Sequence, residues 1–317
     1  MKRRHFIARN CGLLASVPLI GLQPLQLDFM NTEIHKCNIG EFQCTIFKDL
    51  MFTYKAKDYF INAPEQELKQ ALDSYKIDPE NIASPYIAML LQKGNQKILI
   101  DSGIGFSQEP IEFKGNSFVL KGRLQQLLDK EHIATNDITD VIITHFHPDH
   151  IGGLFSSDGT LLFKNATFHM HQKEWDFWHS SKSDSQPPLF KFFVDNNITP
   201  LKKENVQLIA QDYHEICEGV VAVNAEGHTA GQIALIIGDK DERLLYISDA
   251  FLHPFHMEKL DWQTSFDFDH ANAKKTRNKL LHLAHTERMM INAFHFNFPG
   301  LGFAEKSGAN WKWVYHG

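Results

Sequence analysis

Four side chains that can bind metal ions stand close together in the segment THFHPDH, residues 144–150. They are His145, His147, Asp149 and His150. Imidazole nitrogens and carboxylate oxygens are suitable ligands for first-row metal ions. The first two histidines alternate around Phe146, so both can point the same way, and Pro148 ends any regular strand before the other two ligands. One metal site with open positions would not take four ligands from one loop, so the segment predicts two adjacent metal ions.

Further ligands for a two-metal site are expected at other strand ends, because one loop cannot complete it. Three residues meet this condition: His228 in EGHTAG, Asp249 in YISDA and His295 in AFHFNFPG. The chain has 18 histidines, and most of them, taken singly, are ordinary core or surface side chains. We therefore assign metal binding only to these three residues and the four in the loop.

Hydrophobic periodicity predicts strands and helices in both halves of the chain, with the candidate ligands just after strands. The main expected strands are 35–39, 42–48, two around Gly94-Asn95 within 86–105, and 138–144. The main expected helices are 64–75, 123–133 and 269–285. Segment 180–188 is expected to be a loop that acts as a lid or spacer. This arrangement favours an α/β fold in which two sheets face each other with helices outside them.

The composition is that of a folded protein with a large core. The chain has 317 residues, of which 43% are hydrophobic and 12% aromatic, which excludes a disordered or low-complexity sequence. The formal net charge of −6 disfavours a nucleic-acid partner. We expect a small-molecule substrate, and a homodimer is compatible with the sequence.

The N-terminus resembles an export signal. Residues 1–10 are basic and residues 11–22 form an apolar stretch that is too short to span a bilayer. The pair Arg3-Arg4 ahead of that stretch is similar to a twin-arginine signal. We expect residues 1–22 to be this signal and 23–317 to be a single catalytic domain, periplasmic or secreted, without stable membrane insertion. The alternative is an amphipathic or disordered tail.

Two of the four cysteines are expected to face each other. The segment CNIGEFQC reads as a tight hairpin that turns at Gly40-Glu41 and places Cys37 opposite Cys44. The pair can form a disulfide in an oxidising compartment or can act as two small buried hydrophobic side chains. The C-x-x-C spacing typical of metal-binding cysteines is absent from the sequence.

The motifs together resemble a known family. HFHPDH matches H-x-H-x-D-H, the signature of the metallo-β-lactamase-fold metallohydrolases, and GHTAG, SDA and LIDSG (99–103) are similar to that superfamily's other motifs, in the same order. The resemblance extends over about residues 35–300. It implies a four-layer αββα sandwich. It also implies two divalent metal ions, Zn²⁺ in the first place, with Mn²⁺, Fe²⁺ or Co²⁺ as alternatives.

The resemblance also implies roles for individual residues. His145, His147 and His228 would bind one metal, Asp149, His150 and His295 the other, and Asp249 would bridge them. It implies catalytic roles for Asp149 and Asp249, with a metal-bridging hydroxide as nucleophile and Asp249 passing a proton to the leaving group. Asp101 is either an orienting partner of a ligand histidine or a plain turn residue.

The motifs indicate the branch of the superfamily, and hence the substrate, less clearly than the superfamily itself. SDAFLHP (248–254) and HFNFPGLG (295–302) resemble the branch of methyl parathion hydrolase and lactonase-like enzymes, which implies hydrolysis of a lactone or carboxylic ester, or of a phosphotriester. Lactonases carry a tyrosine three residues after the bridging aspartate, where this chain has Leu252 followed by His253. His253 is either a replacement catalytic donor or a loop histidine. Five aromatic residues could line an apolar pocket or belong to the core: Phe251, Phe296, Phe298, Trp175 and Trp178.

Other functions remain as alternatives. A thioesterase of the glyoxalase II type would need a basic helical region for its anionic substrate, and one helix carries Lys274, Lys275, Arg277 and Lys279. A non-catalytic metal-binding homologue would keep the ligands without the activity. A β-lactamase would be expected to carry cysteine or serine in place of Asp249. A nuclease would need a basic surface that this acidic chain lacks.

Overall fold

The computed structural model describes residues 32–113, 115–239 and 242–316. The expected export signal, residues 1–22, lies outside these ranges. None of the helices in the described ranges is long and apolar enough to cross a membrane.

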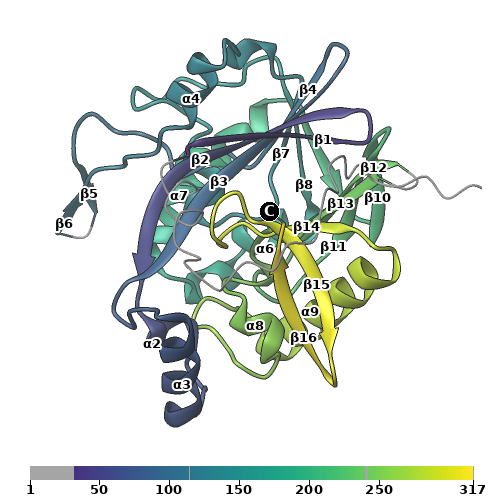
Figure 1. Ribbon diagram of the computed structural model, residues 1–317. Helices are drawn as coiled ribbons and strands as arrows, with labels where there is room; N and C mark the ends of the chain where they lie inside the picture. Colours follow the sequence, from purple (N-terminus) through teal and green to yellow (C-terminus); the bar gives the residue numbers. More distant parts are fainter. Residues whose placement is uncertain (1–31, 114, 240–241, 317) are drawn as a thin grey trace, which may run out of the picture.

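Two seven-stranded sheets form the centre of the molecule (Figure 1). The first sheet has the order β1 (Ile34–Ile39), β2 (Phe42–Tyr54), β3 (Ile82–Lys93), β4 (Gln96–Ile100), β7 (Asp140–Ile142), β8 (Thr167–His171) and β9 (Val206–Ile209). The second has the order β10 (Tyr213–Cys217), β11 (Val220–Asn224), β12 (Ile233–Asp239), β13 (Glu242–Tyr246), β14 (Met290–Asn292), β15 (Leu301–Ser307) and β16 (Asn310–Tyr315). A separate hairpin of β5 (Ile111–Phe113) and β6 (Asn116–Phe118) stands away from the body of the molecule.

The two sheets pack face to face because their strands are apolar on both sides. Along β3, Ile87, Met89 and Leu91 belong to the core that the strand shares with the second sheet. The alternate residues Ala88 and Leu90 belong to the core between the first sheet and its helices. A strand buried on both faces reads as a continuous apolar run, because successive side chains point to opposite faces.

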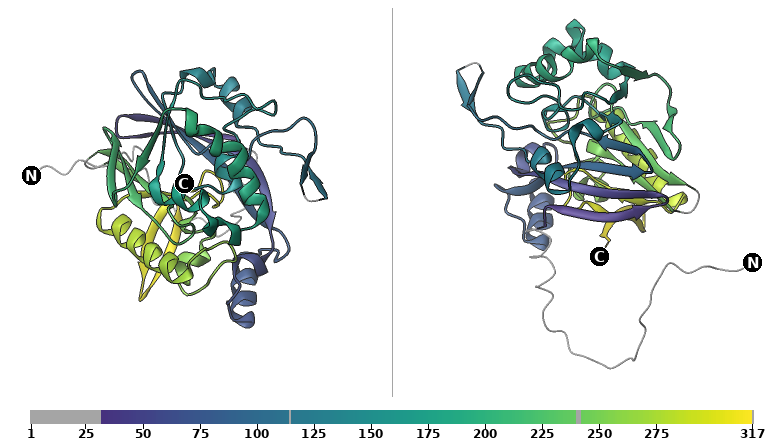
Figure 2. Two further views of the ribbon diagram at one scale, coloured as in Figure 1. Left: turned by 180° about the vertical axis from the view of Figure 1, so that it is seen from behind. Right: turned by 90° about the horizontal axis from the view of Figure 1, so that it is seen from above.

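Helices cover the outer faces of both sheets (Figure 2). On the first sheet these are α4 (Leu124–Lys130), α6 (Gln172–Trp178) and α7 (Pro188–Asn197). On the second sheet α9 (His270–Thr286) buries Leu280, Leu281 and Ala284 against the strands. The result is the four-layer αββα sandwich that the motifs predicted.

Shorter helices complete the molecule. A satellite core at one end of the sandwich joins α2 (Ala56–Tyr59), α3 (Glu65–Tyr75) and α8 (Phe255–Glu258). The remaining helical segments are α5 (Pro148–Ile151) and the 3₁₀ turns η1 (Thr135–Asp137), η2 (Ser181–Ser185), η3 (Thr199–Lys203) and η4 (Ser248–Ala250).

Most expected elements occur close to their expected bounds. α3 follows Pro64, and α9 begins after Asp269, whose side chain accepts a hydrogen bond from the backbone N–H of Asn272 at 3.0 Å. The strand expected at 42–48 continues to Tyr54. The loop expected at 180–188 contains η2 and leads directly into α7. The hairpin β15–β16, which completes the second sheet, was not predicted.

The cysteine hairpin has the predicted register. Cys37 pairs with Cys44 across β1 and β2, and both are free thiols in the structure. A hydrogen bond from Cys44 lowers the pKa of the Cys37 thiol to about 5, against the opposing effect of burial.

Parallel pairing brings strand ends to one edge of each sheet. In the first sheet β4 runs parallel to β7, and in the second β13 runs parallel to β14. Parallel neighbours end at the same edge, and ligand sites form beyond these carboxyl ends. Asp101 and His145 follow β4 and β7, and Asp249 and His295 follow β13 and β14, so topology alone places these four residues on one rim.

Candidate metal centre

The ligand loop is shaped by a proline and two glycines. His147 stands just before α5, with Pro148 in the first turn, where its missing N–H costs nothing. A Cβ on Gly152 would come within 2.1 Å of the carbonyl oxygen of Ile104, and one on Gly153 within 2.0 Å of that of Ser102. The end of α5 therefore packs directly on the backbone after β4, which fixes the position of the loop.

All seven candidate ligands meet in two groups. The first ligand group is His145, His147, His228 and Asp249, and the second ligand group is Asp149, His150, Asp249 and His295. In each group the ligand atoms lie within 4.8 Å of one another, and every member is buried. The three segments after β11, β13 and β14 thus join the loop after β7, and the two sheets share one site.

Asp249 belongs to both groups. Its Oδ2 lies 3.5 Å from Nε2 of His228 in the first group and 3.0 Å from Nε2 of His295 in the second. Its Oδ1 lies 3.3 Å from Nε2 of His150. A carboxylate in this position has oxygens available to both groups at once.

The geometry fits two cations. Three buried atoms that face the groups have no hydrogen-bond partner within the described chain: Nε2 of His145, Nε2 of His150 and Oδ1 of Asp249. Buried polar atoms without partners are costly, and a cation would satisfy all three. Nδ1 of His147 lies 3.0 Å from Nε2 of His228. Two nitrogens bound to one tetrahedral Zn²⁺ lie about 3.3 Å apart, so a small adjustment admits the ion.

The second group is held by Asp101 and Ser84. Nδ1 of His150 donates to Oδ2 of Asp101 at 2.9 Å, and this carboxylate also accepts from the backbone N–H of Thr144 at 2.9 Å. Oγ of Ser84 lies 2.9 Å from Nδ1 of His295, and the hydroxyl of Tyr59 lies 2.8 Å from the same Oγ. These contacts leave Nε2 of each imidazole facing the group. Asp101 therefore has the orienting position and is not a plain turn residue.

The first group is held by a buried ion pair. Nδ1 of His228 lies 3.2 Å from Oδ1 of Asp267, and the guanidinium of Arg277 donates to Oδ2 of Asp267 at 2.7 Å. Burial opposes ionisation of Asp267, but the charge of Arg277 and the hydrogen bonds lower the pKa of this carboxyl below its usual range. Asp267 is thus an anion that fixes the ring of His228. Neither residue of this ion pair was predicted.

Glu174 ties two ligand loops together. Its buried carboxylate accepts hydrogen bonds from the backbone N–H of Phe146 at 3.1 Å and of Gly231 at 2.7 Å. The indole N–H of Trp178 adds a third at 2.8 Å. Burial raises the pKa of Glu174 despite these donors. The sequence offered no signal for this residue, because a glutamate in a helix is ordinarily exposed.

The pKa shifts of His145 and His147 have the opposite direction to that of His150. Burial lowers the pKa of His145 and of His147 well below the usual value, so these rings are neutral, as metal binding requires. Burial also works against protonation of His150, but the charges of Asp249, Asp101 and Asp149 outweigh it and raise that pKa well above its usual value. The second group is the more anionic of the two.

Comparison with known proteins decides the family. The family model described as the metallo-beta-lactamase superfamily matches residues 86–290, more than half of the chain. The chain belongs to the metallo-β-lactamase superfamily. A search of curated proteins gave no significant match.

Solved structures share the metallo-β-lactamase fold. One is AidC, described as a dizinc quorum-quenching lactonase in complex with a product, with a TM-score of 0.76, 23% identity, and coverage of 90% of this chain and 97% of that one. Another is the hydrolase AbOPH, with a TM-score of 0.78, 22% identity, and coverage of 90% and 98%. A probable metal-dependent hydrolase from Staphylococcus aureus has a TM-score of 0.73, 19% identity, and coverage of 88% and 99%. The superfamily, these neighbours and the two ligand groups support a metal-dependent hydrolase that uses two divalent metal ions.

His253 lies apart from the ligand groups of this metallo-β-lactamase site. Its ring packs against Phe60 at 5.5 Å and Phe255 at 4.5 Å between centroids, in the satellite core. Its Nδ1 accepts a hydrogen bond from the backbone N–H of Phe255 at 3.2 Å, and burial lowers its pKa to about 3. This environment is that of a neutral packing residue, in keeping with the loop-histidine alternative. Leu252, at the lactonase tyrosine position, is only 2% exposed.

The aromatic residues near the metallo-β-lactamase site differ from those expected. Four of the expected five are buried in the cores: Phe251, Phe296, Phe298 and Trp178. Trp175 packs on His179 at 4.4 Å. Different rings reach the ligands: Phe190 lies 4.7 Å from His147, Phe294 4.0 Å from His150, and Tyr86 5.6 Å from His295. Four of the five residues therefore follow the core alternative, because position after a ligand does not determine which way a ring points.

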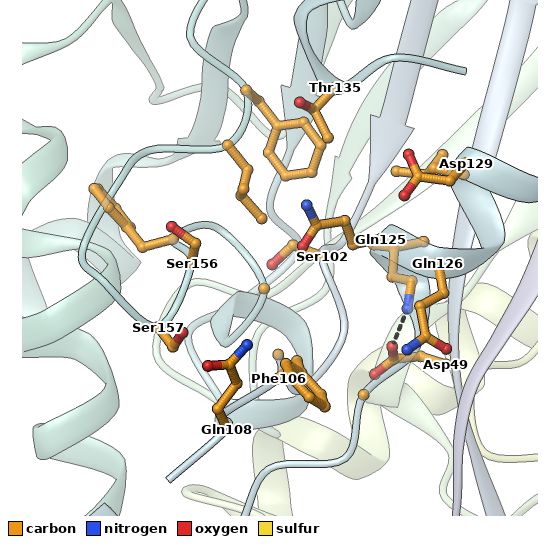
Figure 3. A pocket seen from close by; sticks show the side chains of 18 residues that line it. Asp49, Ser102, Phe106, Gln108, Gln125, Gln126, Asp129, Thr135, Ser156 and Ser157 are labelled. Atoms are coloured by element: carbon orange, nitrogen blue, oxygen red, sulfur yellow. Dashed lines mark hydrogen bonds between the residues drawn. The ribbon is translucent and has the colours of Figure 1, made fainter. Parts of the chain in front are cut away.

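A separate cavity of about 270 Å³ is lined by residues that include Gly153, which follows α5 (Figure 3). Asp49, Ser102, Gln125 and Ser156 are among the polar residues that line it. Its lining contains none of the seven ligands. Asp49 accepts hydrogen bonds from the backbone N–H groups of Ile104 and Leu124, and burial raises its pKa to about 6. This cavity belongs to the support of the loop rather than to the metal centre.

Proposed function

We propose that the protein hydrolyses a neutral ester-type bond, a lactone or a carboxylic ester, with a phosphotriester as a secondary substrate. The observation that carries the proposal is the pair of adjacent ligand groups that share Asp249. When bound, two divalent ions, Zn²⁺ in this proposal, supply a hydroxide at neutral pH and polarise the oxygen of the substrate. The structural similarity to AidC, a lactonase, and to AbOPH, a hydrolase, supports this reaction class.

The protein's own residues supply the remaining chemistry. The ligand histidines and Asp149 hold the cations in place. The charges of His295 and His150, and their hydrogen bonds, overcome the effect of burial and lower the pKa of Asp249 well below its usual value. An ionised Asp249 could accept the proton that water loses when it becomes the attacking hydroxide, and could pass this proton to the leaving oxygen.

Aromatic rings at the rim support an apolar substrate. Phe190 lies beside His147, and Phe268, which is 49% exposed, donates its backbone N–H to the carbonyl oxygen of His228. Phe52, 45% exposed, packs on Tyr54 at 4.9 Å. An acyl or aryl group that covers such rings gains about 25 cal/mol for each Å² of apolar surface it buries.

The thioesterase alternative is weaker because three of the four cations of α9 already have partners in the chain. Arg277 is buried and bound to Asp267 and to the carbonyl oxygen of Ala250. Lys274 pairs with Asp261, and Lys279 donates to the carbonyl oxygen of Asn224. An anionic substrate needs a cation free to pair with it, and these three are already engaged.

A hydrolysis screen tests the proposal. Metal-loaded protein is assayed against lactones, aryl esters, phosphotriesters, thioesters and β-lactams, with metal-stripped protein as the matched control. We expect lactones or carboxylic esters to give the highest kcat/KM, rising with acyl chain length. Preference for glutathione thioesters would establish the alternative reaction, and inactivity on every class would favour a non-catalytic metal-binding homologue.

We also propose export through the twin-arginine route, supported by Arg3-Arg4 ahead of a short apolar stretch. Replacing both residues with lysine keeps the charge and removes the signal. The doubly substituted protein should stay in the cytoplasm in a fractionation experiment, whereas the unchanged chain should reach the periplasm. Equal export of both proteins would contradict this route.

A further inference from the structure

Two tyrosine hydroxyls meet beside the second ligand group. Tyr54 ends β2 and Tyr86 lies on the neighbouring strand β3, and their hydroxyl oxygens are 2.6 Å apart. Both rings stand edge-on to the imidazole of His295, with centroid distances of 6.4 Å for Tyr54 and 5.6 Å for Tyr86. The hydroxyl pair therefore belongs to the surroundings of the metal centre, although neither residue is a candidate ligand.

One of the two phenolic protons of the pair is not used in the hydrogen bond between the hydroxyls. Each phenol has one proton to donate, and the bond between the two hydroxyls uses only one of them. Among the described residues, each of the two hydroxyls has a hydrogen bond to the other and to no further group. Tyr86 is 6% exposed and stacks under Phe52, whereas Tyr54 is only partly buried. When Tyr86 donates to Tyr54, the free proton lies on the hydroxyl that a substrate can reach.

The position of Tyr54 is fixed and its proton is retained. Phe52 packs on its ring at 4.9 Å and Phe266 at 5.4 Å, so the side chain stands in an aromatic wall. A phenol is protonated at neutral pH, so the hydroxyl of Tyr54 can donate a hydrogen bond.

We propose that Tyr54 donates a hydrogen bond to the substrate's carbonyl oxygen on the side of the second ligand group, with Tyr86 holding its hydroxyl in place. This rests on the proposed ester or lactone hydrolysis. As the carbonyl carbon is attacked, its oxygen gains negative charge, and a preplaced donor stabilises that charge without losing its proton. Leu252 and His253 do not supply such a donor, because Leu252 is apolar and buried and His253 packs on Phe60 and Phe255.

The test compares Tyr54→Phe with Tyr86→Phe in metal-loaded protein. Both changes remove one hydroxyl and keep the ring, but only the first removes the substrate's donor. We expect Tyr54→Phe to lower kcat on the best ester or lactone about 100-fold with little change in KM, as the loss of one such donor does. Tyr86→Phe should lower kcat less than 10-fold, since the free proton of Tyr54 remains. Metal content and Tm, measured for both variants, should match the unchanged protein.

Three results would contradict or limit the proposed role of Tyr54. Equal kcat for Tyr54→Phe and the unchanged protein overturns the assignment, and so does loss of metal from Tyr54→Phe, which would make the residue a structural support. Replacing Tyr54 with a fluorotyrosine, which changes the acidity of the donor but preserves its shape, should alter kcat, and an unaltered kcat also counts against the proposal. If the unchanged metal-loaded protein hydrolyses no ester or lactone, the proposed function fails independently of Tyr54.

Discussion

The two ligand groups share Asp249 but are built differently. The first has one carboxylate with three imidazoles, and the second has two carboxylates with two imidazoles. A buried ion pair of Asp267 and Arg277 holds His228 in the first group. A neutral pair of hydroxyls, Ser84 and Tyr59, holds His295 in the second.

The charge of a ligand group and the charge of the residues that hold its histidines in place can therefore differ. Breaking one member of a buried ion pair leaves an unpaired charge, which costs about 3–5 kcal/mol of stability. Breaking a neutral hydrogen bond costs about 1–3 kcal/mol. The support of His228 is therefore tied to folding, while the support of His295 can be altered with the fold intact. The following substitutions test this contrast.

Replacing Asp249 with alanine should have the largest effect, because both groups lose a ligand. We expect metal content to fall below one equivalent per chain and kcat/KM to fall about 10³-fold or more, since the cations supply several kcal/mol of transition-state stabilisation. Elemental analysis and steady-state kinetics measure both quantities. Asp137→Ala, at an exposed residue paired with Lys97, is the control. Retention of two metals would show that Asp249 is not shared.

Changing one group at a time should remove one metal. Asp149→Ala alters only the second group and His147→Ala only the first, so each variant should retain about one equivalent of cation. The cobalt(II) absorption spectra of the two proteins should then differ, because imidazole-rich and carboxylate-rich sites have different ligand fields. Two identical spectra would mean that the groups do not bind separate ions.

Asp267→Asn should affect stability and metal binding together. The substitution leaves Arg277 buried without its anion, so we expect the free energy of unfolding to fall by about 3–5 kcal/mol. Metal affinity at the first group should fall about 10–100-fold, the usual effect of losing a partner that orients a ligand histidine. Urea unfolding and competition with a chelator measure the two effects. If Asp267→Asn weakens metal binding but leaves the free energy of unfolding unchanged, Asp267 orients His228 without stabilising the fold, contrary to this prediction.

Ser84→Ala should have the smallest effect. It removes the hydroxyl between Tyr59 and His295, so the unfolding free energy should fall by about 1–3 kcal/mol and the affinity of the second group by less than in Asp267→Asn. Ser183→Ala is a matched control, because Ser183 is also buried and also hydrogen-bonded, but to backbone carbonyls. Calorimetric unfolding with and without metal gives the comparison. An effect equal to that of Asp267→Asn would contradict the contrast between charged and neutral supports.

The seven candidate ligands could be chosen from the sequence because four of them stand in one loop and the others follow apolar strands, and the structure brings all seven together. The supports could not be predicted in the same way. Ser84 lies 211 positions from His295, and Asp267 lies 39 positions from His228, so no local spacing connects them. Each is a single polar residue in an ordinary context, and only the tertiary packing shows what it contacts.

The fold was predictable for a related reason. Strands such as β3 are apolar on both faces, and α9 has a clear cap, so their patterns are strong. The aromatic residues were not predictable, because the chain has 25 phenylalanines and their rings are distributed among several cores. Tertiary packing places Phe190, a residue of α7, beside His147 and places Phe296 against Trp313.

Because one centre takes ligands from both sheets, the supply of cation becomes a determinant of how long the folded protein survives. A ligand that binds only the native state stabilises it in proportion to the logarithm of its free concentration, by about 4.1 kcal/mol at a thousand times its Kd. Where free metal is scarce, the sandwich loses that contribution and its unfolded fraction rises. The amount of protein that persists in a cell or its surroundings should then follow metal supply, even at constant synthesis.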